Sequence, residues 1–161
     1  MLCKVNKVGF TLIELVVTLA IVAILASVAM PMLKVTVQRS KETELRQNLQ
    51  QLRLAIDAYK KAVEEERIKK TVEQSGYPPN LEVLVNGVVD EKDPKKNLIK
   101  FLRRIPPDPM RNANAPIEHA HDWGLRSYES NADKPFYNTD VYDVYSLSQL
   151  KGSNGVPYAQ W

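Results

Sequence analysis

Few residues of this 161-residue chain have the types and spacing that catalysis or metal binding requires. His119, His121 and Asp122 stand close together, but two histidines two positions apart have no third strong metal ligand nearby. Asp140 and Asp143 could form a pair of acid and base, yet no nucleophile motif or glycine-rich loop accompanies them. The sequence therefore predicts that the chain is not an enzyme and has no cofactor.

One carboxylate, Glu14, is unusual because of its position. The run of residues 10–30 is apolar except for Glu14, Thr11, Thr18 and Ser27. At about 1.5 Å per residue, a helix over this run is roughly 30 Å long, which is enough to cross a bilayer. An acidic side chain inside a membrane segment costs about 2.5–3.5 kcal/mol on insertion scales, so we expect Glu14 to have a partner.

A cut in front of the apolar run would create such a partner. Lys4 and Lys7 precede Gly9, and no Lys or Arg follows Phe10 within two helical turns of Glu14. Cleavage between Gly9 and Phe10 would create an α-amino group at the membrane depth of Glu14. The carboxylate of one copy could then pair with the amine of a neighbouring copy. The alternative is a plain single-span anchor with a stray glutamate.

The segment GFTLIEL at residues 9–15 matches, without a gap, the N-terminal motif of type IV pilins and pseudopilins, and the chain resembles that superfamily. The resemblance implies cleavage after Gly9 by a prepilin peptidase, N-methylation of Phe10 and subunit assembly through Glu14. It places the chain in the bacterial inner membrane as a single-pass protein with its head in the periplasm. Pro31 is expected to kink the helix, because proline removes one backbone hydrogen bond.

Beyond the span, apolar side chains recur at steps of four and three residues, which places them on one face of a helix. They are Leu45, Leu49, Leu52, Ile56, Tyr59 and Val63. Charged side chains, among them Glu42, Arg46 and Arg53, are expected on the opposite face. The apolar stripe could be a coiled-coil seam between subunits. We expect it instead to pack under the chain's own C-terminal domain, since it is short for a free-standing coil.

The helix is expected to run from Phe10 to about Lys70, with the charged runs at residues 64–67 and 69–70 forming a solvated end. The cluster at residues 75–79 then stops it. Asn80 is expected to cap a short helix that ends near Gly87. Strands are predicted at residues 141–147 and, more weakly, at 123–128. Asp108 is expected to be a turn residue, and the tail at 152–161 is expected to be a loop whose terminal aromatics dock on the head.

Segments 76–85, 102–112 and 142–148 resemble the major pseudopilin (G-type subunit) family of the type II secretion system. This implies an α+β fold in which a long N-terminal helix packs against a small antiparallel-sheet head. The expected parts are a cleaved leader (1–9), the transmembrane half of the helix (10–33), its amphipathic half (34–72) and the periplasmic head (73–161). The implied function is that of a subunit of a periplasmic pseudopilus that drives folded exoproteins through the outer membrane.

The same resemblance implies a set of partners. These are further copies of the chain as a homopolymer, the prepilin peptidase, minor pseudopilins, the inner-membrane assembly platform, exoproteins and the secretin. Nucleic acid is not expected, because the net charge of +3 is spread over both signs without a basic block.

Many members of this pseudopilin family bind calcium in the C-terminal loop through closely spaced aspartates, since this cation needs several oxygen ligands. No Asp or Glu follows Asp143 in this chain. Ser148, Ser153 and Asn154 could supply only neutral side-chain oxygens, which would make a weak site. We therefore expect no calcium, and a self-supporting turn at residues 152–155.

Two other functions share part of this pattern. The first is a subunit of a type IV pilus for adhesion, motility or DNA uptake. Pilins of that kind commonly close a C-terminal loop with two cysteines, and this chain has none after Cys3. The second is a membrane-anchored monomer with a binding head, for which Glu14 would be dispensable.

Overall fold

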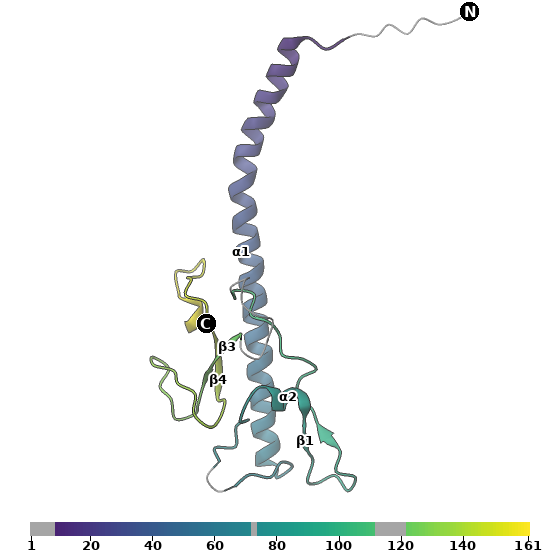
Figure 1. Ribbon diagram of the computed structural model, residues 1–161, viewed down its shortest axis with the longest axis vertical. Helices are drawn as coiled ribbons and strands as arrows, with labels where there is room; N and C mark the ends of the chain where they lie inside the picture. The colour runs from purple at the N-terminus through teal and green to yellow at the C-terminus, as the bar shows by residue number, and fades with distance from the viewer. Residues whose placement is uncertain (1–8, 72–73, 112–121) are drawn as a thin grey trace, which may run out of the picture. The chain divides into compact units, whose positions relative to one another are not determined.

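The computed structural model describes residues 9–71, 74–111 and 122–161, apart from the side chains of residues 28–32. Its elements are α1 (Leu12–Glu64), α2 (Glu82–Asn86), β1 (Val88–Val89), β2 (Leu98–Ile99), β3 (Trp123–Arg126), β4 (Asp143–Ser146) and the short 3-10 helix η2 (Tyr158–Gln160) (Figure 1). The chain forms two compact units, residues 1–39 and 40–161, and α1 contributes to both. The predicted α+β class, with a long N-terminal helix and antiparallel strands, is confirmed.

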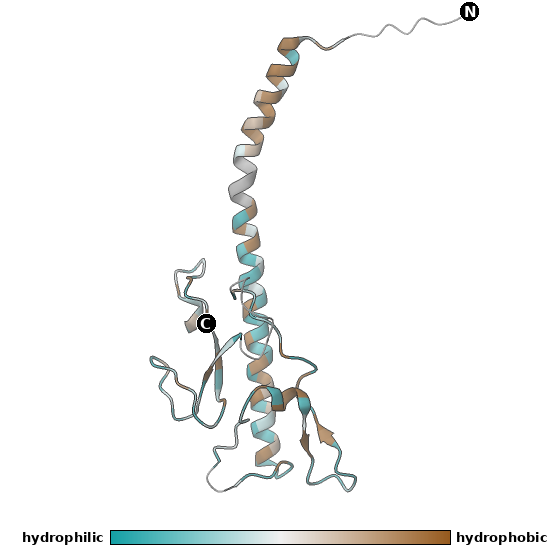
Figure 2. Ribbon diagram, in the orientation of Figure 1, coloured by the Kyte–Doolittle hydropathy of each residue, from teal (hydrophilic) through white to brown (hydrophobic). Residues whose placement is uncertain are grey.

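The first unit exposes apolar side chains around the whole of its helix. Leu15, Leu19 and Leu25 are each more than half exposed, and Figure 2 shows strongly hydrophobic residues along this part of α1. Within the described residues, no helix is both long enough and apolar enough to cross a membrane. The helix is assigned without interruption through Pro31, and the kink expected there stays a prediction.

In the second unit, the apolar stripe of α1 is the base of the hydrophobic core. Every residue predicted for that stripe is buried, with Leu45 and Leu52 fully inaccessible to solvent. The core cluster adds residues from the later segments, including Leu84 of α2, Trp123 of β3 and Val144 of β4. The prediction that the stripe packs under the chain's own C-terminal residues is therefore confirmed.

The end of α1 differs from the prediction, because the helix ends at Glu64 and not near Lys70. Glu66 has a left-handed backbone with φ of 57°, which stops a helix. The amide of Arg67 donates to the carbonyl of Ala62 at 2.9 Å and so satisfies one of the last carbonyls. The charged runs at residues 64–67 and 69–70 are exposed or half-exposed, as expected, although most of them lie beyond the end of the helix. Ile68, between the two runs, is buried.

Arg67 holds this turn against the segment after β1. Its guanidinium makes an ion pair with Asp90 at 2.6 Å, and its carbonyl accepts a hydrogen bond from the amide of Glu91 at 2.8 Å. The hydrogen bond from Arg67 holds the pKa of the Asp90 carboxyl below its usual value. The ion pair between Arg67 and Asp90, which no local sequence pattern indicates, therefore holds the turn that follows α1.

The strands of the described part of the chain form two separate antiparallel pairs. Val88 of β1 pairs with Ile99 of β2, and Trp123 of β3 pairs with Ser146 of β4. Two small sheets thus replace the single sheet expected. The β3–β4 pair packs closely, because a Cβ on Gly124 would lie 2.3 Å from the ring of Tyr145.

The short helix α2 forms as predicted. The side-chain oxygen of Asn80 accepts a hydrogen bond from the amide of Val83 at 3.0 Å, as a capping residue does. Gly87 closes the helix with φ of 91°, in the region that favours glycine.

Asp108 is the turn residue that was expected, and it also joins two segments. It accepts hydrogen bonds from the amide of Met110 at 2.8 Å and from the hydroxyl of Ser146 at 2.6 Å. Burial raises the pKa of the Asp108 carboxyl. The proline-rich turn is therefore fixed to β4 by a buried carboxylate.

The leucines at positions 52 and 54 provide a matched test of the core. Leu52→Ala leaves a cavity under the head and should lower the free energy of unfolding by about 2–5 kcal/mol. Leu54 is 60% exposed, so Leu54→Ala should change that free energy by less than about 1 kcal/mol. Chemical denaturation of the chain in detergent measures both values, and equal losses would contradict this account of the core.

The Arg67–Asp90 pair predicts a stability that depends on pH. A carboxyl with a lowered pKa in the folded state contributes stability above its unfolded pKa, and that stability is lost as pH falls through the folded pKa. Asp90→Asn should therefore be less stable than the wild type near neutral pH, and the difference should shrink below about pH 4. Asp133→Asn, at an exposed carboxylate, is the control. A difference that stays constant between neutral and acidic pH would disprove the ion-pair contribution.

Candidate functional site

Glu14 lies at the start of α1 in a reciprocal cap with Thr11. The amide of Glu14 donates to the hydroxyl of Thr11 at 3.3 Å. In return, Oε2 of Glu14 accepts hydrogen bonds from the amide of Thr11 at 3.1 Å and from its hydroxyl at 3.0 Å. This is a capping box, which satisfies amides that a helix start otherwise leaves unpaired. This role was not predicted from the sequence, although the Thr-x-x-Glu spacing is a signal for it.

The capping box involves only one oxygen of the carboxylate. Among the described residues, Oε1 of Glu14 accepts no hydrogen bond and Glu14 forms no ion pair. A carboxylate can accept bonds at both oxygens. The cap therefore orients Glu14 and leaves Oε1 able to accept a hydrogen bond from a cation outside this chain.

Gly9 and Phe10 precede this cap and are exposed. Phe10 is 90% exposed. A Cβ placed on Gly9 would meet no described atom within 4 Å, and Gly9 has no positive φ that would require glycine. Neither packing nor backbone conformation in this structure accounts for the glycine at position 9.

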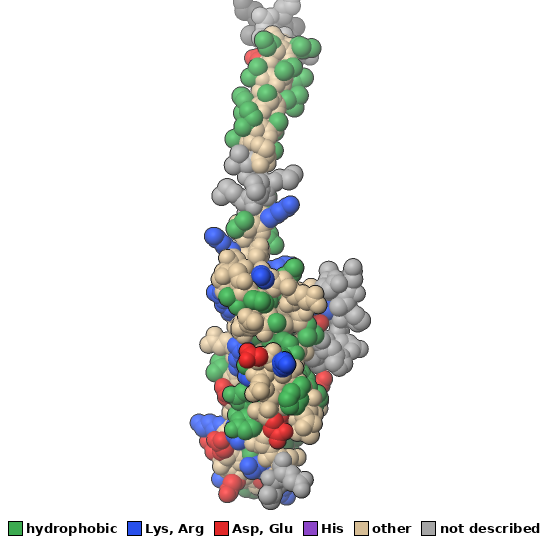
Figure 3. Space-filling model, turned by 90° about the vertical axis from the view of Figure 1, so that its left-hand side faces the viewer, with side chains coloured by type: hydrophobic (Ala, Val, Ile, Leu, Met, Phe, Trp, Pro, Cys, Tyr) green, Lys and Arg blue, Asp and Glu red, His purple; other side chains and the backbone are tan. Residues whose placement is uncertain are grey.

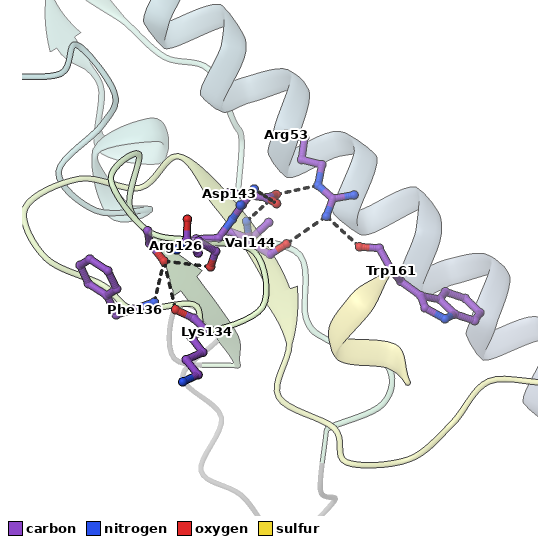
Figure 4. Close-up of polar contacts among 9 residues, drawn as sticks. Arg53, Arg126, Lys134, Phe136, Asp143, Val144 and Trp161 are labelled. Atoms are coloured by element: carbon purple, nitrogen blue, oxygen red, sulfur yellow. Dashed lines mark hydrogen bonds and ion pairs between the residues drawn. The ribbon is translucent and has the colours of Figure 1, made fainter. Parts of the chain in front are cut away.

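The aspartates considered as an acid and base have structural partners instead. Asp143 accepts from Arg53 at 2.8 Å and from Arg126 at 3.0 Å, so it joins α1 to β3 and β4 (Figure 4). Asp140 accepts a hydrogen bond from the amide of Tyr128 at 3.1 Å and another from the hydroxyl of Ser75. The two carboxylates are therefore held by separate groups.

The possible metal ligands near position 120 are only partly described. His119 and His121 lie outside the described residues. Asp122 forms an ion pair with Arg111 at 3.1 Å. In the described segments, no three His, Cys, Asp or Glu side chains gather as a metal ion would require.

Three charged side chains of α1, which were expected on the face opposite the apolar stripe, contact the C-terminal segment. Glu42, Arg46 and Arg53 are spaced four and seven residues apart, which places them within about 40° of one another around a helix. We call these three residues the polar stripe. The guanidinium of Arg46 lies 4.3 Å from the centre of the Trp161 ring. Arg53 donates to the main-chain oxygen of Trp161 at 2.8 Å (Figure 4).

Glu42 is the most buried member of the polar stripe, with 4% of its surface exposed. Its Oε1 accepts from the amide of Ser153 at 2.7 Å and from the hydroxyl of Tyr158 at 3.0 Å. Its Oε2 accepts from the hydroxyl of Ser153 at 2.6 Å. The expectation of a self-supporting turn at residues 152–155 was therefore incomplete. The turn has its own hydrogen bond, from the amide of Gly155 to the carbonyl of Gly152 at 2.9 Å, but α1 also holds it.

The C-terminal tail docks on the rest of the head, as predicted. Tyr158 is buried, and its ring meets that of Trp161 edge to face at 5.0 Å. The tail is not only a loop, because residues 158–160 form the helix η2.

The residues of this loop do not fit a calcium ion. The side-chain oxygen of Asn154 accepts from the amide of Val156 at 3.1 Å, and that of Ser148 accepts from the amide of Leu150 at 3.4 Å. The nearby carboxylate, Glu42, has hydrogen-bond donors directed at both oxygens. Calcium takes six to eight oxygen ligands, several of them usually carboxylates. A cation would have to displace these donors to reach Glu42.

Comparisons with known proteins found two similarities in sequence. Residues 8–30 match the model of the prokaryotic N-terminal methylation motif. The chain is also 30% identical over 108 residues to type II secretion system core protein G of Pseudomonas aeruginosa, across 65% of this chain and 68% of that protein. No solved structure matches the chain.

The capping box makes Thr11 a testable positioning residue for Glu14. Thr11→Ala removes the hydroxyl that accepts from the Glu14 amide, so amide exchange at Glu14 should accelerate about fivefold. Thr11→Ser should keep the slow rate. Thr18→Ala is the control, because the Thr18 hydroxyl donates to the carbonyl of Leu15 within the helix. Hydrogen exchange of the chain in detergent gives these rates, and an unchanged rate in Thr11→Ala would refute the cap.

Proposed function

The chain belongs to the pilin-like family of type II secretion system core protein G, and from this membership we propose that it polymerises into the periplasmic pseudopilus of a type II secretion system. Proteins of this family are structural subunits, and the chain is not an enzyme. The observation that carries polymerisation is the segment of residues 9–15, where an exposed Gly9-Phe10 junction precedes the cap of Glu14, and the similarity to core protein G favours the secretion system. Growth of the fibre would push folded exoproteins through the outer-membrane secretin.

Processing is the first step of the proposed pathway. A prepilin peptidase would cut between Gly9 and Phe10, and the new amine of Phe10 would be methylated. The exposure of Phe10 supports access to this bond. Glycine at position 9 is unexplained by packing, and a requirement of the peptidase for a residue without a side chain would account for it.

Membrane insertion is the second step. In the described residues after Phe10, the first half of α1 presents apolar side chains on all sides, and Figure 3 shows them covering its visible face. A helix that is apolar all round needs a nonpolar environment. We assign that environment to the inner membrane before assembly and to neighbouring helices in the fibre afterwards. The head would lie in the periplasm.

Assembly through Glu14 is the third step. Thr11 holds Oε2, and Oε1 would accept a hydrogen bond from the Phe10 amine of a neighbouring copy. Both charges would otherwise be stranded in apolar surroundings, which is costly for each of them. The pairing would therefore fix the axial register of one subunit against the next.

Glu14→Ala should leave membrane insertion intact and reduce fibre yield at least about tenfold, since it leaves the Phe10 amine as an uncompensated charge in apolar surroundings, which costs more than about 1.4 kcal/mol. Membrane fractionation and quantification of sheared or cross-linked fibres measure the two properties. Glu44→Ala, at an exposed carboxylate on the same helix, should assemble normally. Normal fibre yield from Glu14→Ala would remove the basis for the pairing.

The secretion role is separated from a type IV pilus role by deletion of the gene. We expect exoproteins to accumulate in the periplasm while surface fibres, twitching and DNA uptake stay normal. Loss of surface fibres with normal secretion would show that the subunit belongs to a pilus. Cross-linking in the wild type would then identify the minor pseudopilins and the assembly-platform proteins that we expect as partners.

A further inference from the structure

We propose that the Glu42 carboxylate takes the place of a cation in this chain and anchors the C-terminal loop to α1, so that the head folds in the same way with or without calcium. The proposal does not depend on which fibre the chain builds. It concerns the contacts of Glu42 with Ser153 and with Tyr158, which lie 111 and 116 positions later in the sequence.

The geometry at Glu42 is that of a buried carboxylate whose charge is compensated by donors. Both its oxygens accept hydrogen bonds, from the amide and hydroxyl of Ser153 and from the hydroxyl of Tyr158, at 2.6 to 3.0 Å. Hydrogen bonds to a charged acceptor are the stronger kind, and a buried carboxylate needs them. Glu42 therefore holds the loop in place, as a bound cation would, but with the charges reversed. In a cation site the loop supplies oxygen ligands to a positive ion, whereas here the loop supplies hydrogen-bond donors to a carboxylate of α1.

The charges around the loop also oppose a bound cation. Arg46 and Arg53, the other members of the polar stripe, both contact Trp161. Lys151 lies in the loop itself and is exposed. Arg46 and Lys151 repel a divalent cation, whereas the charge of Arg53 is paired with Asp143. Glu42 is the only carboxylate for which a contact with residues 148–161 is described.

The remaining contacts of the loop explain why one carboxylate is enough to hold it against α1. The amide of Tyr158 donates to the carbonyl of Leu150 at 3.1 Å, and the amide of Gly152 donates to the carbonyl of Val156 at 2.9 Å. A Cβ on Gly152 would lie 2.3 Å from the ring of Trp161, so this ring covers the start of the turn. Backbone bonds close the turn, the aromatic side chains cover it, and Glu42 attaches it to α1.

The first test is the effect of calcium on the wild-type chain in detergent. The melting temperature should be the same, within about 1 °C, in millimolar calcium and in excess EDTA. Trypsin cleavage after Lys151, followed by mass spectrometry, reports opening of the loop directly, and its rate should also be the same in both buffers. A melting temperature that rises with calcium, or cleavage that EDTA accelerates, would overturn the proposal.

The second test is the carboxylate itself. Glu42→Ala leaves the donors of Ser153 and Tyr158 without their acceptor, so the melting temperature should fall by roughly 5–10 °C. Cleavage after Lys151 should accelerate at least about tenfold. Glu44→Ala, two residues away and exposed, should match the wild type in both measurements.

Milder variants keep the test decisive if Glu42→Ala fails to fold. Tyr158→Phe and Ser153→Ala each remove one hydroxyl donor, and each should accelerate cleavage after Lys151 about threefold to tenfold in either buffer. Wild-type cleavage rates in both variants would show that Glu42 does not hold the loop, and would refute the proposal.

Discussion

Burial of the apolar stripe on α1 is the constraint on which the head depends. An amphipathic helix cannot bury such a stripe alone, and the segments after α1 are too short to form a core without it. The two strand pairs contain two and four residues per strand, and α2 contains five residues. Leu52 and Ile56 belong to the same buried cluster as residues of these short elements, so the helix is the surface that gives them a common core. The polar contacts of Arg53 and Glu42 then fix the orientation in which the pieces pack.

The first half of α1 differs from the second half, because its apolar surface needs a covering partner from outside the chain. Its described apolar side chains are largely exposed, and an exposed apolar surface of this extent marks a site of interaction. In the account proposed here, the membrane covers it first and other subunits cover it later. Thr11 and Glu14 occupy the start of this helix, where a capped carboxylate keeps one oxygen available. The same carboxylate thus serves local helix formation and, by proposal, contact between subunits.

Features encoded by local spacing could be predicted from the sequence, and features encoded by distant contacts could not. The stripe from Leu45 to Val63 follows from its steps of three and four, and α2 follows from Asn80 and Gly87. The end of α1 depends on Arg67 meeting Asp90, and the burial of Glu42 depends on Ser153, so neither has a local signal. The capping box is different, because its Thr-x-x-Glu spacing was visible. It was not predicted because the apolar residues around Glu14 pointed to a membrane carboxylate in need of a cation.

The central claim is that the chain enters a pilin-type pathway through cleavage at the junction in front of the capped Glu14. Intact-mass analysis with N-terminal sequencing, on protein purified from its native membrane, tests it most directly. The account predicts a chain that lacks residues 1–9 and begins at N-methylated Phe10. A chain that still begins at Met1 would contradict the account, since no amine would then be available to Glu14 and the protein would be a plain anchored head.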